Sequence, residues 1–127
     1  MYKKVTPVLL VDAIEPVIPF WEALGFARTA EVPHGDRLGF LILAADGIEV
    51  MYQTFDSVRA DEPRSLEGPR APGAAMVYIE VADFDAVSKR VPARSDVIVA
   101  KRTTFYGATE MFLRDPAGNV IGFAQMG

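Results

Sequence analysis

The chain has 127 residues, half of them hydrophobic, which suits one small domain or two half-domains that share a core. It contains no cysteine and a single histidine, His34, so disulfides, thiolate metal sites and multi-histidine metal centres built from one chain are excluded. The formal net charge of -4 argues against a nucleic-acid groove, and no apolar run approaches the roughly 20 residues that a membrane-spanning helix needs. We therefore expect a cytoplasmic protein with no nucleic-acid partner and no membrane contact.

The first half of the chain predicts the order strand, helix, three strands. Residues 5–11 form a short apolar run rich in β-branched side chains, which favours a strand. Asp12, with Glu15 three residues later, predicts a capped helix start, Pro19 predicts a distortion of that helix, and Gly25 is placed to end it. The strands expected next are at residues 26–32, 37–44 and 48–55, the last two forming a hairpin.

The second half repeats this order after a segment of linker composition. Residues 58–73 are rich in proline, glycine and charged side chains, which predicts a linker between a first module at residues 1–57 and a second at 74–127. The elements expected in the second module are a strand at 76–81, a helix from Asp83 to Val91, and strands at 96–103, 109–114 and 119–125.

A near-repeat of two hairpins supports duplication. Residues 39–50 and 110–123 each contain an apolar run, a turn with Ala, Asp and Gly, and a second apolar run. The copies differ where Glu49 follows Ile48 in the first and Gly122 follows Ile121 in the second. A unit of about 50 residues is too small to bury its own sheet, so the halves are expected to share a surface.

Several local patterns occur twice and in the same order. In the first half, a strand and Val-Asp are followed by a predicted helix with Phe20-Trp21 and then by Leu24-Gly25-Phe26. In the second half, the first predicted strand ends at Val81-Ala82-Asp83, and the sequence RDPAGN lies at residues 114–119. This ordered set resembles the vicinal oxygen chelate superfamily, which includes glyoxalase I, extradiol dioxygenases, fosfomycin-resistance enzymes and bleomycin-resistance proteins. The resemblance covers essentially the whole chain. It implies an α+β fold in which two tandem βαβββ modules form a cupped mixed sheet.

The resemblance also identifies four positions where enzymes of that superfamily place metal ligands, on the first and last strand of each module. In this sequence they fall on Thr6, Glu49, Met76 and Gly122, of which only Glu49 could hold a metal firmly. A catalytic divalent ion generally keeps at least three protein ligands. We therefore expect no metal and no other cofactor, and no metal-dependent glyoxalase or dioxygenase activity.

The bleomycin-resistance branch is the part of the superfamily that this pattern resembles in character. It implies a metal-free homodimer that sequesters a planar, often cationic drug, and hence a role in antibiotic resistance. The candidate ligand-binding residues are the aromatics Phe40, Tyr52, Tyr78, Phe105 and Tyr106. The alternative is a metal-independent isomerase or lyase with Glu49 as catalytic general base, provided that Glu49 faces the cup; a register slip of one residue would turn it to solvent.

Other conspicuous residues have simpler interpretations. Residues 105–107 (FYG) predict a mobile, exposed loop that could touch a ligand, whereas Phe112 and Phe123 are expected to pack beneath the sheet. Trp21 has helical spacing typical of a core residue. We expect Asp115 to stabilise its own turn, and His34 to be a loop residue without a role.

Overall fold

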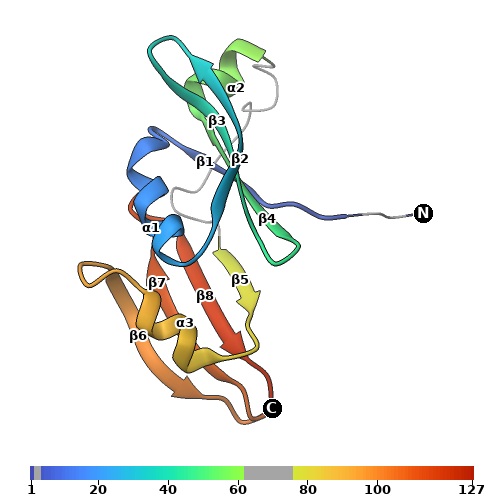
Figure 1. The fold of residues 1–127 in the computed structure, drawn as a ribbon, viewed down its shortest axis with the longest axis vertical. Helices are drawn as coiled ribbons and strands as arrows, with labels where there is room; N and C mark the ends of the chain where they lie inside the picture. The colour runs from blue at the N-terminus through green and yellow to red at the C-terminus, as the bar shows by residue number, and fades with distance from the viewer. Residues whose placement is uncertain (2–3, 62–75) are drawn as a thin grey trace. The chain divides into compact units, whose positions relative to one another are not determined.

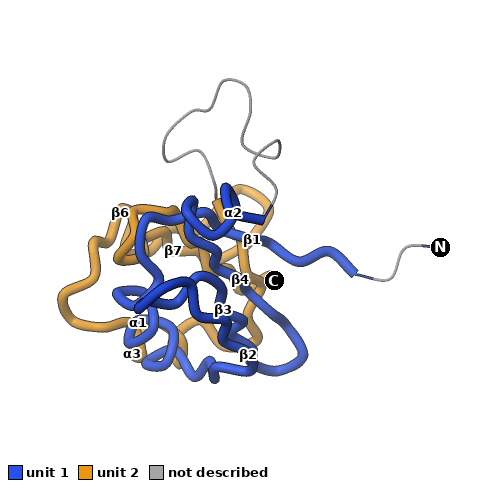
Figure 2. Tube along the Cα trace, turned by 90° about the horizontal axis from the view of Figure 1, so that it is seen from above, with its two compact units in different colours: residues 1–71 blue, residues 72–127 orange. Residues whose placement is uncertain are grey.

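The computed structural model describes residues 1, 4–61 and 76–127, which fall into two compact units, Met1–Ala71 and Pro72–Gly127 (Figure 2). Each unit contains a four-stranded mixed sheet in which the first and last strands are parallel neighbours. This confirms the predicted α+β class and its two tandem modules. Across these described residues, no helix is long and apolar enough to cross a membrane.

Unit 1 builds its sheet in the order β1-β4-β3-β2 (Figure 1). The strands are β1 (Val8–Val11), β2 (Ala27–His34), β3 (Arg37–Ala45) and β4 (Ile48–Thr54). Between β1 and β2 the chain forms a 3₁₀ turn, Glu15–Val17, followed by α1 (Ile18–Ala23). The predicted strand positions are confirmed to within about three residues.

The start of this helix differs in part from the sequence-based expectation. The change from a 3₁₀ turn to a short α-helix confirms the predicted distortion around Pro19, and Gly25 ends the helix with a φ of 95°. The predicted cap at Asp12 is wrong, because Ile14 precedes the first turn and no side chain caps it. Glu15 instead accepts a hydrogen bond from the Leu38 backbone N–H at 2.8 Å, so its carboxylate ties the helix to β3.

The core of unit 1 lies between α1 and one face of the sheet. The side chains that alternate toward α1 from β3 and β4 are fully or almost fully buried: Leu41, Leu43, Val50 and Tyr52. Trp21 of α1 is also fully buried, and its indole N–H donates to the Tyr52 hydroxyl at 2.9 Å. This confirms Trp21 as a core residue.

A second helix, α2 (Phe55–Asp61), follows β4 directly. The strand predicted to run to Phe55 ends at Thr54, and the first residues of the expected linker, from Val58 to Asp61, are helical. Asp56 and Arg59 form an ion pair of 3.2 Å one turn apart, and Arg59 lies 5.8 Å from the Phe55 ring centre, so local side-chain contacts support the helix. The rest of the expected linker lies outside the described residues.

Unit 2 repeats the arrangement with the strand order β5-β8-β7-β6. Its elements are β5 (Met76–Glu80), α3 (Phe84–Arg90), β6 (Asp96–Thr103), β7 (Thr109–Arg114) and β8 (Val120–Gln125). Asp83 caps α3 by accepting the Ala86 N–H at 3.1 Å. Asp115 accepts backbone N–H bonds from Ala117 and Asn119 at 3.0 and 2.8 Å, which confirms its predicted role in its own turn.

The two faces of this second sheet differ in character. One face packs with Phe84 of α3 and is buried and apolar; from the sheet it contains Ile79, Met111, Leu113, Ile121 and Phe123. The other, here named the helix-free face, contains Met76, Tyr78, Glu110, Phe112 and Gly122. Phe123 packs beneath the sheet as predicted. The same prediction for Phe112 is wrong, because Phe112 is the cross-strand partner of Gly122, whereas Phe123 is the partner of Met111.

Candidate functional site

The helix-free face carries a cluster of aromatic and charged side chains, here named the Tyr78 cluster, which consists of Tyr78, Arg102, Glu110 and Phe112. Strand register brings them together. Tyr78 on β5 and Phe112 on β7 are both paired with Gly122 on the strand between them. Arg102 on β6 is paired with Glu110, two residues before Phe112 on the same face of β7.

Glu110 is the buried polar centre of the Tyr78 cluster. Its side chain is only 2% exposed, and Arg102 donates from Nε to Oε1 at 2.7 Å. The Tyr78 hydroxyl donates to the other carboxylate oxygen, Oε2. A buried carboxylate is costly unless such partners compensate it, and here both oxygens are satisfied.

These hydrogen bonds set the protonation states of the two acids. The bond from Tyr78, assisted by Arg102, holds the pKa of Glu110 below its ordinary value. The same bond to Glu110 raises the pKa of the Tyr78 phenol, with a smaller contribution from a hydrogen bond with Tyr106. At neutral pH Glu110 is therefore an ionised carboxylate and Tyr78 a protonated phenol.

Gly122 makes room for the two rings of the Tyr78 cluster. A β-carbon at this position would lie 2.7 Å from a ring carbon of Phe112 and 3.1 Å from a ring carbon of Tyr78. The two ring centres are 6.2 Å apart with their planes inclined by 34°. The Arg102 guanidinium lies 6.0 Å from the Phe112 ring centre, so it contacts both the carboxylate and an aromatic ring.

The turn between β6 and β7 places two more aromatics near the Tyr78 cluster. Phe105 is fully exposed and Tyr106 is 57% exposed, with their rings edge to face at 5.0 Å. Backbone and side-chain bonds close the turn: Thr104 N–H donates to the Ala108 carbonyl at 2.8 Å, and Ala108 N–H donates to Thr104 Oγ1 at 2.9 Å. The predicted exposed loop is thus a hydrogen-bonded turn, with Tyr106 in contact with Tyr78.

The structure separates the two predicted ligand-binding aromatics of unit 1. Phe40 is half-buried on the sheet face turned away from α1. Tyr52 lies on the opposite face, fully buried against Trp21. Glu49 shares the face of Phe40, where it is 24% exposed and ion-paired with Lys4. Tyr52 therefore belongs to the core, and the Glu49 carboxylate is bonded to a cation of the same chain.

Strand register places two of the four family ligand positions on the helix-free face. Met76 pairs with Val120, and Gly122 pairs with Tyr78, two residues after Met76 on the same face of β5.

The residues at these positions do not fit a divalent ion. Gly122 offers no donor atom, the Met76 thioether suits only soft metals, and the Glu49 carboxylate is ion-paired with Lys4. Within residues 4–61 and 76–127, no group of three His, Cys, Asp or Glu side chains is placed to hold a metal ion.

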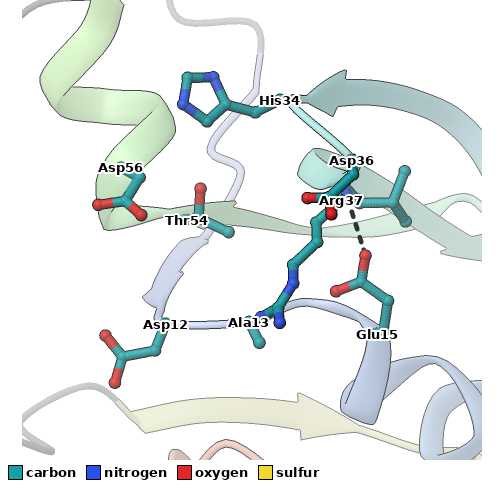
Figure 3. Close-up of a pocket in the computed structure, with 9 residues that line it drawn as sticks. Asp12, Ala13, Glu15, His34, Asp36, Arg37, Thr54 and Asp56 are labelled. Atoms are coloured by element: carbon teal, nitrogen blue, oxygen red, sulfur yellow. Dashed lines mark hydrogen bonds between the residues drawn. The ribbon is translucent and has the colours of Figure 1, made fainter.

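Unit 1 contains a polar cavity of about 240 Å³ between the start of the first helical turn and the β2–β3 turn (Figure 3). Its wall includes four carboxylates and two basic groups, at Asp12, Glu15, Asp36, Asp56, His34 and Arg37. Figure 3 shows Arg37 extending across the cavity toward Ala13 while the Glu15 carboxylate is held by the backbone. Having no aromatic wall, this cavity lacks the features predicted for a planar ligand.

The sequence-based reasoning missed Glu110 and Arg102. The available signal was an isolated glutamate inside an apolar strand, two residues before Phe112 and hence on the same face. Arg102 lies on the preceding strand, where a hairpin register would bring opposite charges together. Because the register of this hairpin contains irregularities between Val97 and Arg102, the pair could not be aligned from spacing alone.

Comparisons with known proteins agree with this architecture. The sequence matches the family model described as the Glyoxalase/Bleomycin resistance protein/Dioxygenase superfamily over residues 5–123. No curated protein sequence matches it significantly.

Several solved structures have a similar fold. TioX from Micromonospora sp. ML1 is 17% identical with a TM-score of 0.79, and the match covers 98% of this chain and 99% of that one. A lactoylglutathione lyase from Agrobacterium tumefaciens is 15% identical with a TM-score of 0.75, covering 97% and 92%. A virulence protein from Salmonella typhimurium is 21% identical with a TM-score of 0.66, covering 100% and 99%.

At these identities the structural matches establish the fold, and the family match establishes the wider relationship, because it spans nearly the whole chain and both units. The four-stranded sheet in each unit and the repeated order of elements agree with it. The chain belongs to the glyoxalase/bleomycin resistance protein/dioxygenase superfamily.

Proposed function

We propose that this protein binds a planar small molecule on the helix-free face of unit 2, without a metal ion, and sequesters it chemically unchanged. The observation that carries the proposal is the Tyr78 cluster. Two aromatic rings lie over a glycine at the centre of the sheet, beside a fully hydrogen-bonded buried carboxylate. A mostly apolar surface with a few fixed polar groups is the usual composition of a small-molecule site.

Ring geometry supports a flat ligand. The side chains of Tyr78 and Phe112 are inclined by only 34°, and Tyr78 is 44% exposed, so part of an aromatic surface remains accessible for stacking. Met76, 58% exposed on the same face, adds an adaptable apolar contact.

The donor chemistry at the family ligand positions supports binding over metal-dependent turnover. Gly122 offers no donor atom, and the rings of Phe112 and Tyr78 occupy the space that a side chain would need. The alternative of a general base at Glu49 has less support, because the negative charge of that carboxylate is already paired with the Lys4 ammonium of the same chain.

The test is equilibrium binding of planar aromatic probes to the full chain, followed by two variants, Tyr78→Leu and Phe112→Leu. Leucine keeps the site apolar but removes the ring face, so each variant should weaken binding by about fivefold to tenfold. Phe55→Leu, in α2 of unit 1, is the matched control and should change affinity little. Bound probe should also be recovered unaltered after long incubation.

Two results would contradict this proposal. Failure of every planar probe to bind would remove the function itself. Conversion of a bound probe into product would replace sequestration with catalysis. We also propose a homodimer, as the resemblance to the bleomycin-resistance branch implies, and sedimentation of the ligand-free protein as a monomer at micromolar concentration would argue against it.

A further inference from the structure

We propose that Arg102 determines which planar ligands are accepted: the Tyr78 cluster selects an aromatic compound that carries a carboxylate and discriminates against cations. This inference rests on the proposed function and adds the charge of the ligand to it.

The Arg102 guanidinium has donors to spare. Its Nε is bonded to Glu110, and among the described residues its other contact is the ring of Phe112. A guanidinium has five N–H donors, so those on the two terminal nitrogens are available. The Arg102 side chain is 57% exposed, which leaves these donors accessible at the rim of the cluster. Their planar fork matches the two oxygens of a carboxylate.

The negative charge of Glu110 offers no comparable site for a cation. Both of its oxygens are bonded within the Tyr78 cluster, and its side chain is 2% exposed. The Phe112 ring, which could attract a cationic ligand, already has Arg102 near its face. A ligand cation stacked here would therefore meet a like charge without an accessible carboxylate to offset it.

The other charged groups of this sheet lie away from the Arg102–Glu110 pair. Arg114 shares the face of Glu110 on β7, but it lies four residues further along the strand, about 14 Å away, and is ion-paired with Asp96 at 3.8 Å. Glu80 is exposed on the helix-free face, but β8 and β7 separate it from β6, which places it about 14 Å from the Arg102 edge at ordinary strand spacing. Lys101 lies 5.7 Å from the ring of Phe84. A ligand whose aromatic ring stacks on Tyr78 and Phe112 can therefore direct its carboxylate toward β6, the edge strand on which Arg102 lies.

Three probes of nearly the same shape separate charge from stacking: naphthoate, naphthamide and naphthylmethylammonium. Binding to the full chain is measured at neutral pH and constant ionic strength. Naphthoate should bind about tenfold to a hundredfold more tightly than naphthamide, since a hydrogen bond to a charged group contributes more than a neutral one. Naphthylmethylammonium should bind most weakly.

Arg102→Lys then tests the residue while preserving its charge. The variant should lose about tenfold in affinity for naphthoate, because a single ammonium cannot reproduce the fork. Naphthamide affinity should stay nearly constant, which also shows that the variant is folded. Arg94→Lys, at an exposed arginine of the same unit, is the matched control and should leave all three affinities unchanged.

The outcomes distinguish this inference from the proposed function. If the cation or the amide binds as tightly as naphthoate, or if Arg102→Lys weakens naphthoate and naphthamide equally, Arg102 does not select the ligand, although a planar-ligand site remains. If none of the three probes binds, the proposed function fails and this inference fails with it.

Discussion

Gly122 shows how one residue can be misjudged when only its missing donor atoms are considered. At the sequence level it marks the loss of a ligand position, because glycine cannot coordinate a metal. In the structure the rings of Phe112 and Tyr78 pack against its α-carbon, in the space that a side chain would occupy. The glycine that offers no metal ligand therefore also provides the space for an aromatic surface.

Gly122→Ala should destabilise the protein. Replacing glycine by alanine inside a strand ordinarily helps folding by a few tenths of a kcal/mol to about 1 kcal/mol. Here the added methyl would lie within 3 Å of two Phe112 ring carbons, and overpacking of this kind costs about 1–3 kcal/mol. Urea unfolding should show a net loss in the single variant.

Gly122→Ala combined with Phe112→Leu is the control, because the smaller side chain relieves the contact. The double variant should show less loss than the two single changes predict together. A single variant as stable as the parent would mean that the rings are not held over this glycine.

Glu110 should make stability depend on pH in the acid range. Its pKa is lowered in the folded protein from an ordinary value of 4.5, chiefly by the Tyr78 hydroxyl and also by Arg102. The stabilisation is therefore fully present above pH 4.5 and is lost as pH falls through the lowered pKa.

Measuring the unfolding free energy from neutral pH to pH 2 should therefore show a steeper acid decline in the parent protein than in Glu110→Gln. Glu22→Gln removes an exposed carboxylate of unit 1, near Arg28, and serves as the comparison. Parallel pH profiles for the parent and Glu110→Gln would contradict the assigned role of the carboxylate.

At the scale of elements, period-two alternation and turn residues made the strands predictable. The β7–β8 turn is an example, since Asp115 closes it with two local hydrogen bonds. Helix α2 was not predicted, because its residues run into a segment rich in proline and charged side chains. The contacts of Arg59 with Asp56 and Phe55 support the helix, but such local contacts leave only a weak pattern in the sequence. Which side chains meet across the sheet is set by strand register, and strand register depends on contacts between residues distant in sequence.

The candidate site shows this limit most clearly. Tyr78 and Tyr106 could be predicted as exposed aromatics from strand and loop positions. Glu110 could not be recognised as the partner of Tyr78, because Tyr78 lies 32 residues earlier and the pairing requires β8 between the two strands. Phe112 was assigned to the wrong face for the same reason, since one residue of register exchanges the faces of a strand.

Alternate side chains of β4 face opposite sides of the sheet, and Tyr52 faces the core of unit 1. A change at Tyr52 should therefore lower stability without weakening ligand binding. Tyr52→Phe would leave the buried Trp21 indole N–H without its acceptor, which should cost about 1–3 kcal/mol of unfolding free energy. Affinity for planar probes should not change, because Tyr52 packs in the core of unit 1. Tyr106→Phe removes the hydroxyl of a 57% exposed side chain together with its hydrogen bond to Tyr78, and should cost less, at most about 1 kcal/mol. A loss of probe binding in Tyr52→Phe would place that residue at the ligand after all.

For the whole molecule, duplication has given two units with the same strand order but different chemistry. Glu49 in unit 1 is ion-paired with Lys4, whereas the register position of its counterpart in unit 2 is Gly122, opposite Tyr78. The two units have thus diverged at the positions where a family metalloenzyme concentrates its ligands. Superfamily membership fixes the scaffold, and these side chains decide its use.

This divergence leads to a prediction about metal. The purified chain should contain no stoichiometric divalent metal by elemental analysis. A metal ion that binds the folded state raises Tm, so adding Zn²⁺, Ni²⁺ or Mg²⁺ should leave the Tm of this protein unchanged.

Gly122→Glu tests why the protein binds no metal. If the missing donor atom alone prevents metal binding, this variant should gain a metal-dependent rise in Tm. No gain is expected, because a glutamate would collide with Phe112 and the Tyr78 hydroxyl would remain bonded to Glu110. Stoichiometric metal in the parent protein would overturn the metal-free site.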